Sequence, residues 1–276
     1  MSFNRYRVQS AIELDIGCEE LDKWGSYLDK FKNYQVDRSK EGMLLNELKY
    51  DAADIYFKAV FSIADAINGL YNKRHSWSVI KLYYAVFFLL RCSLATQKYA
   101  FLKNKGIYTL KIAQNESPTR RDNGKYLGEK VSGDHKTTIK TYIDIFSSSD
   151  ILQTNMINEK VVYVWLMELR NQVNYRERDF TEPAGKYFVP NILNQSKIKN
   201  QIEEYLTDTS YVYCFDEDHS ALATPLKLAQ IVRNQLYNFI DFEPISQEKK
   251  LEINKLVKIS QLNTSRKFTD IYEFRR

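Results

Sequence analysis

The chain has 276 residues, of which 44% are hydrophobic and 14% are aromatic. This length and apolar content exclude global disorder and are sufficient for one large domain or two small ones. Nine glycines and five prolines are few for this length, which favours long helices over a turn-rich β-sandwich.

The cysteines and the apolar runs indicate where the protein resides. Cys18, Cys92 and Cys214 are far apart and have no CxxC spacing. This argues against a disulfide framework or a zinc site and fits a reducing cytoplasm, so no metal and no other cofactor is expected. No apolar run follows Met1–Gln9, so no secretory signal is expected. The longest apolar run, Leu82–Leu90, is half of what a bilayer requires, which predicts a core helix in a soluble, cytoplasmic protein with no membrane partner.

The net charge of +5 is unevenly distributed. Residues 98–140 contain ten Lys or Arg against four Asp or Glu. Clustered cations are typical of a nucleic-acid footprint, and a lysine-rich solvated surface is the alternative. The candidate RNA-binding residues are Lys103, Lys105, Arg120 and Arg121. Nearby aromatic residues either stack on unpaired bases or face the core: Tyr99, Phe101, Tyr108 and Tyr126.

Apolar periodicity predicts the secondary structure in chain order. Residues 1–18 lack a pattern and are expected to be irregular. Helices are predicted over residues 19–34, 41–71, 76–97, 130–146, 157–177, 192–206, 225–240 and 247–260, the seventh with Pro225 at its first position. A β-hairpin is predicted over residues 99–113, with Gly106 at positive φ, followed by an exposed loop at 115–130. Residues 211–215 are predicted to form a short strand.

These elements predict a mainly α fold. We expect a helical bundle with a small β-hairpin insertion and a helical C-terminal extension. The expected segments are 1–40, an N-terminal helical segment; 41–180, the bundle; and 181–276, the extension.

A dense polar cluster ends the helix predicted at residues 157–177. Arg170, Asn171, Asn174 and Tyr175 fall within six residues, behind a stripe of apolar residues at helical spacing. Arg170 and Tyr175 are five residues apart, about 140° around an α-helix. We therefore expect them to meet at one phosphate only through fraying of the helix or through a partner subunit.

Three stretches together resemble the HEPN superfamily of helical-bundle proteins. Residues 77–95 (WSVIKLYYAVFFLLRCSLA) are similar to the aromatic helix of that family, and residues 133–136 (GDHK) are similar to its Ser/Gly-x-His-Lys helix opening. Residues 170–175 (RNQVNY) match the Arg-polar-x-x-x-His ribonuclease motif in the first two positions and have Tyr175 in place of the histidine. They are also similar to a variant that ends Arg-x-x-x-Asp/Asn-Tyr. The resemblance covers residues 41–178.

The resemblance implies a helical bundle that often dimerises, with the motif helices at the interface. Active members cleave RNA without a metal, commonly as toxins or antiviral effectors in prokaryotes. Members with the variant motif pair with nucleotidyltransferases, and others have no demonstrated cleavage. Because no histidine lies between Asn171 and Asp179, the general acid/base of the motif is missing from its position.

The chemistry of the cluster leaves several functions open. Arg170 is suited to neutralising a phosphorane, whereas Tyr175, with an ordinary pKa near ~10, is a poor base at neutral pH. Asn171 and Asn174 orient groups but transfer no protons. His135, at the start of a predicted helix, is a candidate displaced base or a local cap.

Three interpretations of the cluster follow: a structural Arg170 bridging helices through a carboxylate, RNA cleavage, and RNA or nucleotide binding without cleavage. At the level of the whole protein, the first hypothesis is a HEPN-like toxin or antiviral protein that cleaves or binds RNA. The alternative is a non-enzymatic subunit that dimerises and regulates a partner ATPase or nucleotidyltransferase.

Overall fold

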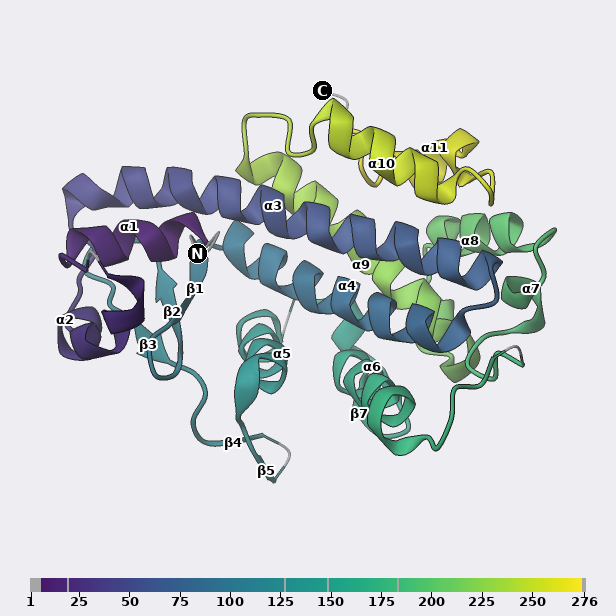
Figure 1. Ribbon diagram of the computed structural model, residues 1–276, viewed down its shortest axis with the longest axis horizontal. Coiled ribbons are helices and arrows are strands. Elements are labelled where there is room, and N and C mark those ends of the chain that lie inside the picture. The colour runs from purple at the N-terminus through teal and green to yellow at the C-terminus, as the bar shows by residue number, and fades with distance from the viewer. Residues whose placement is uncertain (1–5, 19, 127, 148, 183, 275–276) are drawn as a thin grey trace. The chain divides into compact units, whose positions relative to one another are not determined.

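A computed structural model describes residues 6–18, 20–126, 128–147, 149–182 and 184–274 (Figure 1). The fold is mainly α, as predicted. Its helices are α1 (Arg7–Asp15), α2 (Leu28–Lys32), α3 (Arg38–Tyr71), α4 (His75–Thr96), α5 (Gly133–Phe146), α6 (Val162–Asn171), α7 (Pro190–Leu193), α8 (Ile198–Thr207), α9 (Glu217–Phe239), α10 (Gln247–Val257) and α11 (Arg266–Thr269). Shorter helical turns are η1 (Leu21–Tyr27), η2 (Ile151–Gln153), η3 (Gln172–Arg176), η4 (Val212–Cys214) and η5 (Leu262–Thr264).

The strands form three small antiparallel sheets. They are β1 (Tyr99–Lys103), β2 (Ile107–Lys111) and β3 (Thr119–Arg120) in one sheet, β4 (Lys125–Tyr126) and β5 (Glu129–Lys130) in the second, and β6 (Met156–Ile157) and β7 (Lys160–Val161) in the third. The chain divides into two compact units, residues 1–54 with 90–145 and residues 55–89 with 146–276. The helices α3 and α4 run through both units, and each unit is described separately below.

Helix α1 of the first unit corrects the prediction that residues 1–18 are irregular. The Asp51 side chain of α3 accepts hydrogen bonds from the backbone N–H groups of Arg7 (2.7 Å) and Val8 (3.0 Å) and so caps α1. Burial raises the pKa of Asp51 to about 6, although these two N–H groups act in the opposite direction. The cap comes from more than 40 residues away, so the local sequence does not reveal it. The helix predicted at residues 19–34 is also broken, into η1 and α2.

The predicted β-hairpin is formed by β1 and β2, paired from Tyr99 with Lys111 to Lys103 with Ile107. The residue with positive φ in its turn is Lys105 (49°), not Gly106. Residue 106 lies close to Arg120, since a Cβ there would be 3.2–3.3 Å from its guanidinium, which would have to shift by a few tenths of an ångström. The loop predicted at residues 115–130 also contains strands, and its Arg120 pairs with Tyr108 across β2 and β3.

The second unit corrects two predictions about the C-terminal region. Helix α9 begins at Glu217, where the Asp216 side chain accepts the backbone N–H of Asp218 (2.9 Å), so Pro225 lies inside the helix rather than at its start. The strand predicted at 211–215 is the helical turn η4. Tyr211 precedes this turn at φ 58°, in the left-handed region that a strand excludes.

Helices α3 and α4 form the antiparallel pair expected from their short connection, and they lie side by side in Figure 1. In the second unit, Ser78 Oγ donates to the carbonyl oxygen of Ala66 (2.9 Å), and Lys81 forms an ion pair with Asp65 (2.6 Å). Helix α4 is the one helix of the described chain that is long and apolar enough to cross a membrane, but 78% of its most apolar window is buried inside the protein. This burial is typical of a core helix in a soluble protein.

The close approach of α3 to α4 predicts the effect of one substitution. A Cβ at Gly69 would collide with Ser78 Oγ, while its next contact, the carbonyl oxygen of Arg74 at 3.5 Å, is ordinary. We expect Gly69→Ala to lower the free energy of unfolding by about 1–2 kcal/mol, because overpacking outweighs the gain in helix propensity. In a Ser78→Ala background, where the obstructing oxygen is gone, the same change is expected to be neutral or stabilising. Urea unfolding of the wild type, Gly69→Ala, Ser78→Ala and the double variant measures this change of sign. Equal losses of unfolding free energy in both backgrounds would contradict it.

Candidate functional site: an arginine enclosed by tyrosines

The polar cluster of residues 170–175 lies where α6 changes into a π-helical turn. Helix α6 begins at Val162, later than predicted, because Asn158 and Glu159 have positive φ (48° and 62°) and form the turn of the β6–β7 hairpin. The turn η3 is a π-helix, in which the backbone N–H of Glu177 donates to the carbonyl oxygen of Gln172 five residues earlier (2.9 Å). Single π turns inside or at the end of α-helices occur often at functional sites.

The π turn changes which side chains share a face. The ring of Tyr175 lies 5.9 Å from the Arg170 guanidinium, measured to the ring centroid. α-Helical geometry predicts that these residues lie about 140° apart and reach one phosphate only through fraying of the helix or a partner subunit. The π turn, whose backbone hydrogen bond spans five residues, instead brings the two side chains together within one chain.

Arg170 is enclosed by aromatic rings. Only 6% of Arg170 is exposed, and its guanidinium lies 4.8 Å from the ring centroid of Tyr83 and 5.6 Å from that of Tyr84, both on α4. Together with Tyr175, these rings surround the cation on several sides, a favourable arrangement when the cation is desolvated.

The polar contacts of Arg170 are few. Its Nη1 donates to Asn171 Oδ1 (2.9 Å), its side chain is also hydrogen-bonded to that of Tyr83, and its buried Nε has no hydrogen-bond partner among the described residues. Among the described residues no carboxylate lies within 4.0 Å of it, so the predicted structural bridge through a carboxylate is not formed in this part of the chain. The guanidinium therefore depends on the tyrosine rings for most of its environment.

Tyr83, the ring nearest to Arg170, is a poor proton-transfer group. Burial raises the pKa of Tyr83, and the smaller effect of Arg170 acts in the opposite direction. A base must be deprotonated near neutral pH, and a buried phenol with a raised pKa is not. Asn171 and Asn174, both half-buried, carry amides that transfer no protons.

Two exposed rings next to Arg170, those of Tyr84 and Tyr175, and the exposed contacting pair Trp77 and Phe180 form a set that we call the aromatic strip: Trp77, Tyr84, Tyr175 and Phe180. Their exposed fractions are 49%, 36%, 72% and 44%, high values for such large apolar groups. Trp77 and Phe180 form an edge contact with ring centroids 5.6 Å apart. Trp77 and Tyr84 are seven residues apart on α4, about 10 Å along the helix. The segment 175–180 thus places Phe180 beside Trp77 at one end of this stretch of α4 and Tyr175 near Tyr84 at the other.

Cations border the aromatic strip. Arg176 and Arg178 are exposed and lie between Tyr175 and Phe180 in the chain. The carboxylate between them, Glu177, accepts hydrogen bonds from Lys186 Nζ (2.8 Å) and Gln172 Nε2 (2.8 Å). The Lys186 bond is the largest of the effects that lower the pKa of Glu177 to about 2. Its negative charge is therefore compensated locally and does not cancel the two arginines.

The other predicted site residues belong to the first unit. Lys103 forms an ion pair with Asp134 at the start of α5, and Arg120 Nε forms one with Asp122 (2.8 Å). Arg121 Nε donates to Thr109 Oγ1 (2.8 Å), while the side chain of Lys105 is exposed. His135 is half-buried in the first turn of α5. Three of the four predicted RNA-binding cations thus have partners within the protein.

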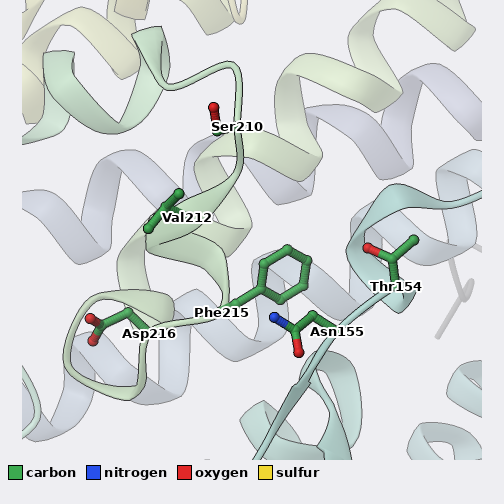
Figure 2. A pocket seen from close by; sticks show the side chains of 6 residues that line it. All are labelled: Thr154, Asn155, Ser210, Val212, Phe215 and Asp216. Atoms are coloured by element: carbon green, nitrogen blue, oxygen red, sulfur yellow. The ribbon is translucent and has the colours of Figure 1, made fainter.

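An open hollow of about 570 Å³ lies elsewhere in the second unit (Figure 2). Its lining residues are Thr154, Asn155, Ser210, Val212, Phe215 and Asp216. Figure 2 shows the side chains of Phe215 and Asn155 next to each other. The one carboxylate of the lining, Asp216, caps α9, so the hollow presents no group prepared for catalysis. In the described part of the chain, no three His, Cys, Asp or Glu residues are grouped to hold a metal ion.

Sequence reasoning missed Trp77, Tyr84 and Phe180 as functional candidates. Helix α4 is apolar nearly all round, so its periodicity does not distinguish the face that stays exposed. The outward positions of α4 are Trp77, Lys81, Tyr84 and Phe88, spaced at i, i+4, i+7 and i+11. A lysine inside an otherwise apolar run is the one local signal of that face.

The fold and site together define a class: a mainly α protein whose surface carries exposed aromatic rings around a buried arginine. Comparison of the chain with protein-family models, with curated proteins and with solved structures finds no match.

Proposed function

We propose that this is a HEPN-like protein that binds single-stranded RNA through the aromatic strip and does not cleave it at the Arg170 motif. The observation that carries the proposal is the exposure of four aromatic side chains next to Arg176 and Arg178. Proteins that bind single strands combine rings on which bases stack with cations that follow the backbone. The resemblance to HEPN proteins suggests a role in a prokaryotic toxin or antiviral system.

The geometry around Arg170 supports binding over cleavage. Metal-independent cleavage needs a group that moves the 2′-hydroxyl proton and a cation that reaches the phosphate. Arg170 is only 6% exposed beneath the rings, and the motif position of the general acid/base holds Tyr175. Arg170 in this arrangement holds Tyr84 and Tyr175 in place by cation–π contacts. Its contribution to RNA binding is therefore indirect.

A titration with labelled single-stranded RNA tests the proposal. We expect an oligonucleotide of about 12 residues to bind with an affinity that falls as salt rises, because each phosphate contact releases counterions. Replacing Arg176 and Arg178 by alanine is expected to reduce the slope of log K against log salt by about 1.4, or ~0.7 for each phosphate that is no longer neutralised. The matched control replaces Lys258 and Arg266, which are also exposed, and leaves the slope unchanged.

The opposite result identifies the alternative function. If the protein binds no RNA at low salt and sediments as a dimer, the aromatic strip serves protein association, as Trp, Tyr and Arg commonly do at interfaces. The protein would then be the interaction subunit considered above, with a partner ATPase or nucleotidyltransferase. If the RNA is shortened during the titration, and a contaminating nuclease is not the cause, the proposed absence of cleavage is contradicted.

A further inference from the structure

A buried histidine lies at the start of α4, and the proposed RNA binding does not use it. His75 is 1% exposed, and neither of its ring nitrogens has a hydrogen-bond partner among the residues that the structure describes. A neutral imidazole carries one donor and one acceptor, so a fully buried ring without partners is costly to keep.

Four described residues from a distant part of the chain lie at the start of α4, where they contact Ser76 or His75 or hold the residues that do, and we call them the latch: Thr181, Glu182, Ala184 and Gly185. Glu182 Oε1 accepts the backbone N–H of Ser76 (2.7 Å), and Glu182 Oε2 accepts Ser76 Oγ–H (2.7 Å). The carboxylate thereby caps the N-terminus of α4. The backbone N–H of Thr181 donates to Ser76 Oγ (3.2 Å).

Gly185 completes the closure. It has φ 65°, and a Cβ at this position would lie 2.7 Å from His75 Nδ1 and 2.6 Å from Leu193 Cδ2. The backbone therefore approaches the imidazole as closely as only glycine permits. The N–H groups of Ala184 (2.8 Å) and Gly185 (3.3 Å) both donate to the carbonyl oxygen of Thr181, which holds the latch in a compact turn.

We propose that His75 operates this latch by taking up a proton: a charged ring at this position releases the latch from the start of α4. In the closed arrangement the protonated ring would have two N–H donors, and among the described residues neither ring nitrogen has an acceptor within hydrogen-bond distance. The N-terminus of α4 adds partial positive charge beside it. An opened latch exposes the ring to water and removes both penalties.

The charges around His75 set the direction of the pH dependence. Burial lowers the pKa of His75, Lys73 in the turn between α3 and α4 also lowers it, and Glu182 acts in the opposite direction. Helix α7, whose Leu193 packs on Gly185, contains no titratable side chain. The open ring has an ordinary pKa near ~6.5 and binds the proton more readily than the closed ring. The latch is therefore most stable above that pH, and the open fraction rises by up to about tenfold for each pH unit below it.

The consequence reaches the aromatic strip, because Phe180 directly precedes the latch and contacts Trp77. Acidification would free Phe180 from Trp77. Opening of the latch is a change in the conformation of the chain and does not require RNA to be the ligand.

Hydrogen exchange tests the latch in the intact protein without any ligand. Protection factors, which correct for the intrinsic pH dependence of amide exchange, are measured between about pH 7.5 and pH 5.5. This range lies above the ordinary pKa of glutamate, so an ordinary glutamate stays charged throughout it. We expect the amides of Ser76, Thr181, Ala184 and Gly185 to lose protection by up to about tenfold per pH unit below the pKa of the open ring, while those of α9 keep theirs. In His75→Leu, which cannot titrate, the pH dependence should vanish.

Three results overturn the proposal: unchanged protection of the latch in the wild type, the same pH response in His75→Leu, or an equal loss throughout the chain. If His75→Leu does not fold, ring signals of the wild type decide. The chain has three histidines, so the NMR titration of His75 can be followed directly. Its midpoint must coincide with the loss of latch protection, and separate midpoints exclude His75 as the operating group.

Discussion

Replacing Trp77 and Tyr175 together by alanine is expected to weaken the binding of single-stranded RNA by about 2 kcal/mol or more, at least roughly 30-fold. These two rings stand at opposite ends of the aromatic strip and are 49% and 72% exposed, so each can present a face to one base. Stacking is worth about 1–3 kcal/mol for each base, and two rings acting on different bases should contribute nearly additively. Fluorescence anisotropy with the labelled oligonucleotide measures the loss.

Phe61→Ala is the matched control for the aromatic strip. Phe61 lies on α3 and is 36% exposed, the same fraction as Tyr84, but it is outside the strip. Phe61→Ala should leave the affinity for RNA unchanged and change the free energy of unfolding by less than about 0.5 kcal/mol. Urea unfolding of the double variant establishes that it is folded under the conditions of the binding measurement. If the double variant binds RNA as tightly as the wild type, the aromatic strip is not the binding surface.

Arg170→Ala is expected to lower the free energy of unfolding by about 3 kcal/mol. The substitution removes a buried side chain and its contacts with three tyrosine rings, and cation–π contacts that exclude water are worth about 2 kcal/mol. Arg170→Met should cost less, about 1 kcal/mol, because a thioether fills the same space and removes the buried, unpartnered Nε. Urea unfolding monitored by circular dichroism provides the measurement.

Arg176→Ala serves as the comparison for Arg170→Ala, since Arg176 is exposed in the adjacent turn and should change stability by less than about 0.5 kcal/mol. A wild-type stability for Arg170→Ala would show that the guanidinium is not held by the rings. The experiment also affects how catalytic assays are interpreted. Loss of any RNA-dependent activity in Arg170→Ala cannot be assigned to chemistry until the folded fraction of the variant is known.

The mainly α fold followed from patterns that the sequence carries locally. Apolar residues at helical spacing predicted α3, α4 and α5, and the alternation on either side of residues 104–106 predicted the β1–β2 hairpin. The failures also have local causes. Tyr211 and Lys105 adopt positive φ without being glycine or asparagine, so their turns carry no recognisable residue.

The sequence by itself determined which residues are chemically able to act: an arginine, two asparagines and a tyrosine within six positions, with no histidine among them. Only the tertiary structure decided what they do together. A π turn brings Tyr175 onto Arg170, and α4 contributes two tyrosines that enclose the guanidinium. It also decided that Trp77 stays exposed and that Glu182 caps α4 from 106 residues away. Helical periodicity depends on neighbours in the chain, whereas exposure and distant caps depend on which surfaces the folded chain leaves uncovered.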